Sequence, residues 1–142
     1  MKVDNLANQI DQIAFLLARH ADQTLQERLG FGFSQFKIFE ILQFSPNLQQ
    51  KQIAGKLSQT EASVSRQIKL SQSQMLLNVY INPKNKREHL ISLTPKGERM
   101  SREAENILDT FHRSIFSKLS AKQQESLSRD LAEIYFTLKG SV

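Results

Sequence analysis

The sequence predicts a mainly α-helical protein that carries one small β-hairpin. Three observations lead to this fold class. Apolar residues recur every three or four positions over most of the 142 residues, the pattern shifts to short β-branched and aromatic runs between residues 76 and 93, and the helical pattern then resumes. The length, with 39% hydrophobic and 23% charged residues, is typical of one globular domain, which we expect to span residues 1–142.

The helices expected at the two ends of the chain have similar apolar stripes. A first helix is expected over residues 5–28, a long helix from 95 to about 117, and a last helix, capped by Ser120 with Gln123, over about 123–138. The first and last share the spacing 0, 4, 7, 11, at Leu6, Ile10, Ile13 and Leu17 and at Leu127, Leu131, Ile134 and Leu138. A domain of this size is too small to cover these stripes, which favours a partner subunit.

Three shorter helices are expected between these ends, over residues 35–44, 49–57 and 61–73. A break at 30–34 precedes the first, with Ser34 as its N-cap. The break at 58–60 offers two caps for the helix that follows, namely Thr60 alone or a capping box of Ser58 with Glu61. Phe31, Phe33, Phe36 and Phe39 could line a ligand pocket, but core packing is the favoured interpretation.

The hairpin is expected from strands over 76–81 and 89–93, joined by a polar loop over 82–88. Thr94 and Pro95 then begin the next helix as N-cap and first residue. Helices 49–57 and 61–73, joined by a three-residue turn, indicate a helix-turn-helix, and the hairpin after them would be its wing. This arrangement suits DNA, because the second helix can enter the major groove while the hairpin reaches phosphates or the minor groove.

The basic residues concentrate in the middle of the chain. Residues 48–102 hold ten basic and three acidic residues, a net charge of +7, whereas the flanks together hold nine basic and eleven acidic residues, a net charge of −2. Arg66 and Lys69 lie three residues apart on a polar helix face, and Lys84, Lys86 and Arg87 crowd the expected wing. A nucleic-acid-binding face would leave this asymmetry, although a solvated basic surface would leave it too.

The expected hairpin loop reads Asn82-Pro83-Lys84-Asn85-Lys86-Arg87, and it is followed by Leu90-Ile91-Ser92-Leu93-Thr94-Pro95-Lys96-Gly97. This stretch resembles the wing of the MarR family of bacterial transcription regulators. Val64-Ser65-Arg66-x-Ile68 is similar to the core of the family's recognition helix, at the usual distance from the wing. Three positions depart from the family pattern. Asn85 replaces an Asp that helps to hold the wing arginine, Met75 replaces a Gly that ends the recognition helix, and Ser71 replaces a packing Leu.

The resemblance implies a homodimeric winged helix-turn-helix regulator, with a DNA-binding lobe over about 34–96 and dimerisation helices over about 5–28 and 97–139. It implies that Arg87 enters the minor groove and that a small aromatic ligand, bound between the dimer region and the DNA-binding lobe, releases the DNA. The residues expected to contact double-stranded DNA are Thr60, Ser63, Ser65, Arg66, Lys69, Lys84, Lys86 and Arg87. We therefore expect a cytoplasmic repressor of a pseudo-palindromic operator.

Other chemistry has little support in the sequence. The chain has no cysteine, its three histidines lack metal-ligand spacing, and no phosphate-binding loop or catalytic triad is recognisable, so we expect no enzyme activity, cofactor or metal site. Asp109 and His112 are expected to be a surface pair. No apolar run is long enough to cross a membrane. Two alternatives stay open, a winged helical module that docks another protein and a DNA-binding architectural protein without an effector.

Overall fold

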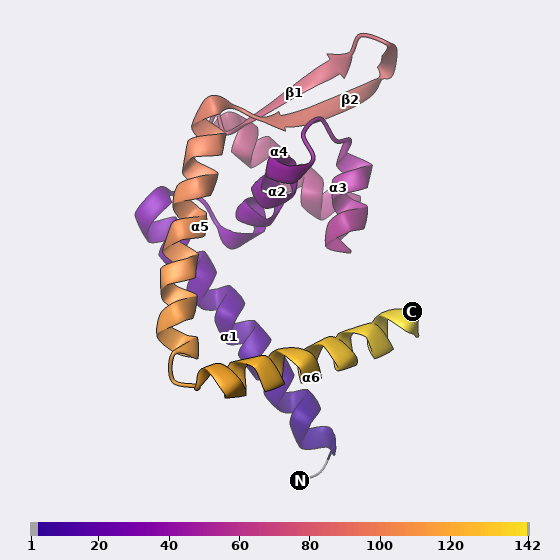
Figure 1. Ribbon diagram of the computed structural model, residues 1–142. Coiled ribbons are helices and arrows are strands. Elements are labelled where there is room, and N and C mark those ends of the chain that lie inside the picture. The colour runs from indigo at the N-terminus through magenta and orange to yellow at the C-terminus, as the bar shows by residue number, and fades with distance from the viewer. Residues whose placement is uncertain (1–2, 142) are drawn as a thin grey trace. The chain divides into compact units, whose positions relative to one another are not determined.

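The structure, a computed structural model, describes residues 3–141 (Figure 1). The elements are the helices α1 (Val3–Leu29), α2 (Phe33–Phe44), α3 (Gln50–Leu57) and α4 (Glu61–Ser73), the strands β1 (Leu77–Asn82) and β2 (Asn85–Leu93), and the helices α5 (Pro95–Phe116) and α6 (Ala121–Gly140). This order confirms the predicted fold class. The chain divides into two compact units, residues 1–106 and 107–142.

The core of the first unit gathers around α2. Phe31, Phe36 and Phe39 are buried, and the rings of Phe31 and Phe39 meet edge to face at 5.2 Å. Further buried side chains come from α1, α3, α4 and the hairpin, including Leu25, Ile53, Val64, Ile68, Leu77 and Ile91. Core packing is therefore confirmed for these three phenylalanines, while Phe33 is half-buried with the Lys37 ammonium 4.9 Å from its ring centre.

The prediction that Ser34 caps the second helix was wrong, because α2 begins at Phe33 with Gly32 as its N-cap. The Phe33 N–H donates to Asp22 Oδ1 at 3.0 Å, and the Gly32 N–H donates to Gln35 Oε1 at 3.0 Å. Two side chains thus satisfy the first free backbone donors of the helix. The carboxylate of Asp22 lies eleven residues earlier in the chain, so the local pattern did not reveal it.

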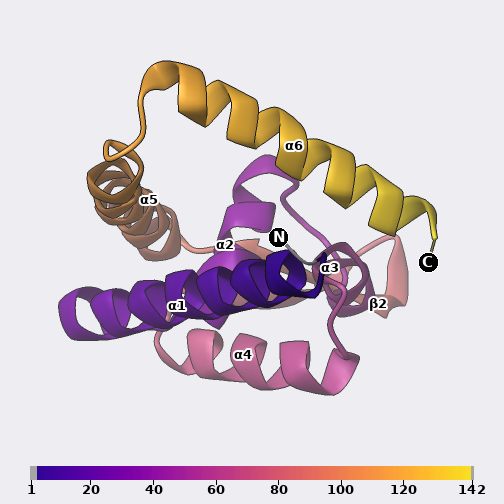
Figure 2. The same cartoon turned by 90° about the horizontal axis from the view of Figure 1, so that it is seen from below.

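Helices α3 and α4 form the predicted helix-turn-helix, and Figure 2 views α3 close to its axis and α4 from the side, so they run in clearly different directions. Thr60 is the N-cap of α4, since its Oγ1 accepts the Ser63 N–H at 3.1 Å. Ser58 instead adopts a left-handed conformation with φ of 52°. Of the two caps left open by the sequence, Thr60 is confirmed.

The hairpin departs from the predicted loop over 82–88, because only Pro83 and Lys84 form its turn and β2 already begins at Asn85. Ile81 pairs with His89 while Asn82 pairs with Asn85, so Lys86, Arg87 and Glu88 face no residue of β1. We call these three residues the wing bulge. The turn closes early because Asn82 Oδ1 accepts the Lys84 N–H at 3.0 Å, and the surplus residues of β2 are then accommodated as a bulge.

In the second unit, the end of α5 leads through a short turn into α6. The Ser120–Gln123 capping box predicted from the sequence is present at the start of α6. No residue of α6 is buried among those described. No described helix is long and apolar enough to cross a membrane, and the described residues hold no cluster of three or more His, Asp or Glu side chains that could bind a metal ion.

Candidate nucleic-acid interface

Helix α4 is anchored by one face and exposes the opposite one. Val64, Ile68 and Ser71, at spacings of four and three residues, are buried against the core of the first unit. That register turns Arg66 and Lys69 outward, and both are exposed. Ser63 and Ser65 lie half-buried on the flanks of α4, and Thr60 is exposed at its N-terminus. The polar residues predicted on this helix therefore line its outer side and its beginning.

A buried polar network fixes α4 relative to the start of α2. Gln35 is 1% exposed and Ser71 is 0% exposed, and Gln35 Nε2 donates to Ser71 Oγ at 2.9 Å and to Gln74 Oε1 at 2.7 Å. The amide of Gln74 in turn donates to the Gly30 carbonyl at 3.0 Å. Ser71, where the MarR pattern has a packing leucine, thus holds a hydrogen bond instead. The sequence carries no local signal for this network, because its partners lie 36 to 44 residues apart.

Helix α4 ends as a glycine-terminated helix would, but with methionine in that position. The Leu76 N–H donates to the Ser71 carbonyl and the Met75 N–H to the Gln72 carbonyl, which is a Schellman motif. Met75 has φ of 62°, in the left-handed region that favours glycine. The helix therefore stops at the position that the glycine of the MarR pattern would give, at a cost in backbone strain.

The hairpin presents three cations at its tip. Lys84 lies in the turn and Lys86 and Arg87 lie in the wing bulge, and all three are exposed. Asn85, which replaces the family aspartate, accepts the Arg87 N–H with its Oδ1 at 3.2 Å. The backbone beside the arginine is thus held by an amide oxygen, where a carboxylate would make a charge-assisted bond.

Three consecutive residues before α3 fasten the hairpin to the helix-turn-helix. Asn47 Oδ1 accepts a hydrogen bond from the Tyr80 hydroxyl, and Leu48 pairs with Ile91 through two backbone hydrogen bonds of 3.2 and 2.8 Å. Gln49 donates from its side-chain amide to Glu88 Oε1. The hairpin is therefore tied to the segment that begins α3 by both backbone and side chains.

The Thr94-x-x-Gly97 motif joins the hairpin to α5. Thr94 Oγ1 donates to the Met75 carbonyl at 2.7 Å and accepts the Gly97 N–H at 2.9 Å. A Cβ on Gly97 would lie 2.1 Å from the Leu76 carbonyl oxygen, so only glycine permits this close approach of α5 to the end of α4. The N-cap and helix start predicted at Thr94 and Pro95 are confirmed.

All ten basic residues counted between positions 48 and 102 are exposed. They lie on α3, α4, the hairpin and the first turns of α5, all within the first unit. Because none of them is needed in the core, their positive charge is available to a polyanion.

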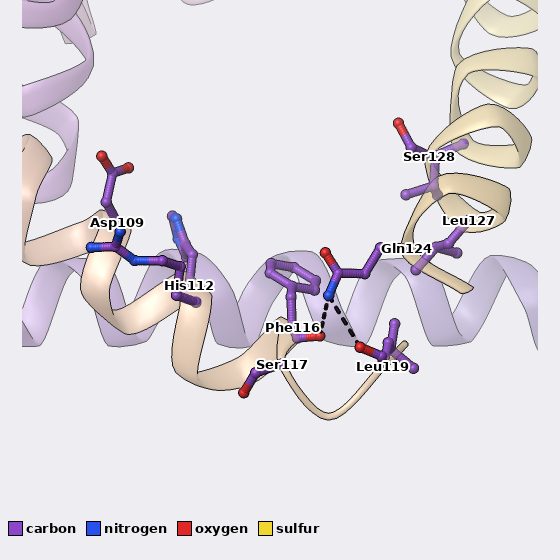
Figure 3. Close-up of a pocket in the computed structure, with 10 residues that line it drawn as sticks. Asp109, His112, Phe116, Ser117, Leu119, Gln124, Leu127 and Ser128 are labelled. Atoms are coloured by element: carbon purple, nitrogen blue, oxygen red, sulfur yellow. Dashed lines mark hydrogen bonds between the residues drawn. The ribbon is translucent and has the colours of Figure 1, made fainter. Parts of the chain in front are cut away.

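The second unit carries an open pocket of about 780 Å³ between α5 and α6 (Figure 3). Phe116, Leu119, Leu127 and Leu131 give it apolar walls, and Asp109, His112 and Arg113 line its α5 side. Gln124 donates from its amide to the carbonyls of Phe116 and Leu119 at 2.8 and 3.1 Å, which fixes the turn between the two helices. The apolar stripe of α6 is exposed throughout, with Leu131 44% and Leu138 63% accessible.

Protein-family models and curated protein sequences give no match to this chain. Solved structures, in contrast, match this chain over almost its whole length. A MarR/EmrR family transcriptional regulator from Acinetobacter sp. ADP1 matches with a TM-score of 0.83 at 19% identity, covering 99% of both chains. S. aureus MepR in a DNA complex matches with a TM-score of 0.82 at 22% identity, over 96% of this chain and 98% of that one.

PcaV from Streptomyces coelicolor, in complex with its natural ligand, matches with a TM-score of 0.73 at 17% identity, covering 95% of this chain and 92% of the other. These likenesses confirm the resemblance at the level of the fold, which is the winged helix-turn-helix with terminal helices seen in MarR-type regulators.

Proposed function

We propose that this chain is a homodimeric, cytoplasmic, DNA-binding transcription regulator that represses from a pseudo-palindromic operator. The observation that carries the proposal is the placement of the cations. The buried face of α4 turns Arg66 and Lys69 outward, and the wing bulge and turn expose Lys84, Lys86 and Arg87 on a narrow hairpin. A single helix face and a hairpin tip with these cations suit the major groove and the neighbouring backbone or minor groove.

The roles within this set follow from position. Arg66 on the outer face of α4 can read base edges, with Ser63, Ser65 and Lys69 beside it. Thr60 at the N-terminus of α4 is placed for a phosphate, because the helix dipole favours negative charge there. Lys84 and Lys86 neutralise phosphates, and Arg87 inserts into the minor groove. S. aureus MepR, which has been solved in complex with DNA, shares this fold, and that supports DNA binding by the present chain.

The homodimer is supported by apolar stripes that α1, in the first unit, and α6, in the second unit, each expose. Leu6, Ile13 and Leu16 of α1 are 47%, 56% and 50% accessible, and Leu127, Leu131, Ile134 and Leu138 of α6 are 40% to 63% accessible. Monomers rarely leave such stripes in water. A two-fold dimer would cover them and would present two copies of α4 to two half-sites of one duplex.

The test begins with wild-type protein and a randomised duplex library of about 30 base pairs, long enough for two half-sites one helical turn apart. After repeated binding and amplification, we expect enrichment of an inverted repeat. Sedimentation at micromolar protein should give twice the chain mass. A library that stays random, or a monomer that binds a single unrepeated site, would contradict the proposal. Protein capture without DNA binding would support the docking-module alternative.

The repressor and effector parts of the proposal have their own test. PcaV has been solved in complex with its natural ligand, and the shared fold supports a ligand-responsive regulator here. A panel of small aromatic acids and phenols is added to the complex with the selected duplex, and we expect at least one compound to release the DNA. A reporter gene placed behind the selected site should be silenced by the protein. Activation of the reporter would overturn the repressor assignment, and the absence of any release would favour a constitutive binder.

A further inference from the structure

Glu88 is the acidic residue of the wing bulge, and the sequence pattern gives it no role in a basic hairpin. Glu88 is the last residue of the bulge and is half-buried, whereas Lys86 and Arg87 beside it are exposed. Its two carboxylate oxygens accept hydrogen bonds from two different elements. Oε1 accepts from the amide of Gln49, at the N-cap of α3, and Oε2 accepts from Nδ2 of Asn82 at 2.7 Å, at the end of β1.

We propose that Glu88 is a positioning residue that holds the Lys86–Arg87 part of the wing in one orientation relative to the helix-turn-helix. The inference deepens the proposed function and rests on it. An acid at the tip of a DNA-binding hairpin should weaken binding by repelling phosphates. Its presence is explained when both oxygens are occupied by amide donors, because bonds to an ionised acceptor are stronger than bonds between neutral groups.

Glu88 can influence the position of Arg87 because the two residues are neighbours in the wing bulge. Because residues 86–88 have no partner on β1, the ladder does not fix their backbone, and other contacts must do so. The contacts present are at the two ends of the bulge. Asn85 Oδ1 holds the Arg87 N–H at 3.2 Å, and Glu88 is clamped between β1 and α3. Asn82 links the Glu88 end of the bulge to the turn, since its Nδ2 donates to Glu88 and its Oδ1 accepts the Lys84 N–H.

The link also connects the wing to the helix pair that carries α4. Gln49 precedes α3, its N–H donates to Gln52 Oε1 at 2.9 Å, and α3 packs against α4. The carboxylate therefore relates the position of Arg87 to the frame of the recognition helix, beyond the backbone pair Leu48–Ile91. Removing the Glu88 carboxylate should leave the fold intact and let the wing bulge sample several orientations. DNA binding would then be weaker, because the wing is no longer preorganised.

The direction in which Glu88→Gln changes the DNA affinity distinguishes a positioning role from an effect of bulk charge. Glu88→Gln removes one negative charge from the wing, and it replaces one of the two accepting oxygens by an NH2 donor that faces the amide of Gln49 or Asn82. If only charge matters, the variant binds DNA more tightly. If Glu88 positions the wing, we expect the Kd for the selected duplex to rise about five- to tenfold, as is typical for coupled residues in contact. Glu98→Gln is the matched control, because Glu98 is exposed in the first turn of α5 and the charge change is the same.

Two further variants test the route. Gln49→Ala removes the partner of Glu88 from the α3 side with no change of charge, and it should weaken binding in the same direction. In an Arg87→Ala background, Glu88→Gln should cause little additional loss, because the residue that it positions is gone. Circular dichroism and thermal melting establish that each variant is folded, and Gln49→Ala carries the test if Glu88→Gln is not.

The inference is overturned if Glu88→Gln and Gln49→Ala bind the selected duplex as tightly as Glu98→Gln and the wild type do. It is also overturned if Glu88→Gln weakens binding equally with and without Arg87. A failure of the proposed function is visible separately, in the wild type alone, which would then bind no duplex, and the inference would fall with it.

Discussion

The glycine of the Thr94-x-x-Gly97 motif provides a sharp test of the packing between α4, the hairpin and α5. In Gly97→Ala the new Cβ would lie 2.1 Å from the Leu76 carbonyl oxygen, 3.0 Å from its carbon and 3.1 Å from Leu93 Cδ2. The first two atoms are backbone, and the same oxygen accepts the Thr94 N–H at 3.1 Å. The start of α5 must therefore move away from the end of α4, and that hydrogen bond lengthens or breaks.

The magnitude follows from three terms. Overpacking of this kind costs about 1–3 kcal/mol, the strained hydrogen bond costs about 1 kcal/mol, and alanine in place of a helical glycine returns about 0.5–1 kcal/mol. Together these terms predict that Gly97→Ala lowers the free energy of unfolding by about 1–3.5 kcal/mol.

The assay is equilibrium urea unfolding followed by circular dichroism, at one fixed protein concentration because a dimer's stability depends on it. Gly55→Ala is the matched control. A Cβ on Gly55, in the middle of α3, has no neighbour within 4 Å, so that variant should be more stable by about 0.5–1 kcal/mol. A Gly97→Ala variant as stable as the wild type or as Gly55→Ala would contradict the close approach of Gly97 to the Leu76 carbonyl.

Five further variants test α4, the residue that terminates it and the wing. Arg66→Ala should weaken binding to the selected duplex by about 1–3 kcal/mol in gel-shift titrations and leave folding unchanged, and an equal loss on random DNA would make Arg66 a phosphate contact instead. Lys84→Ala should weaken all sites alike and reduce the salt slope by about one unit per copy, hence about two units for the dimer, whereas Arg87→Ala should weaken sites with A·T-rich flanks most, because a narrow minor groove attracts an inserted arginine. Asn85→Asp should keep or improve affinity, because a carboxylate would accept the Arg87 N–H more strongly than the amide does, and a loss as large as that of a lysine would show that the wing acts by bulk charge. Met75→Gly should stabilise the fold by about 0.5–1 kcal/mol in thermal unfolding, because the strain of the left-handed backbone exceeds the entropy cost of glycine and the lost side chain is 71% exposed. An unchanged stability would show that Met75 is not strained.

The elements of the fold could be predicted from the sequence because their signals are local. The apolar spacing of α1 and α6, the cap at Thr60 and the Ser120–Gln123 box all involve residues within a few positions of one another. The start of α2 was misplaced because its cap depends on Asp22, eleven residues away across the Gly30–Gly32 break. Element boundaries that depend on contacts between different elements therefore cannot be predicted from local sequence patterns.

The exposure of the candidate cations could be predicted from the sequence, but the way the hairpin arranges them could not. Exposed cations on α4 and the hairpin follow from a polar helix face and a polar loop. The wing bulge depends on early closure of the turn by Asn82, and its clamp joins Glu88 to Gln49, 39 residues earlier. The Gln35–Ser71 bond spans 36 residues. Contacts at these separations leave no period in the sequence, so only the structure reveals them.

The most direct test of the central claim is the salt dependence of binding to the selected duplex. Each copy exposes Arg66, Lys69, Lys84, Lys86 and Arg87 toward the proposed interface, and a dimer doubles that number. Each phosphate neutralised contributes about −0.9 to the slope of log K against log salt concentration. Arg66 and Arg87 are assigned to base edges and to the minor groove, so the three lysines of each copy predict a slope of about −5 or steeper for the wild-type dimer. A slope near zero, with the protein still folded, would contradict DNA binding through this face and would favour the protein-docking module.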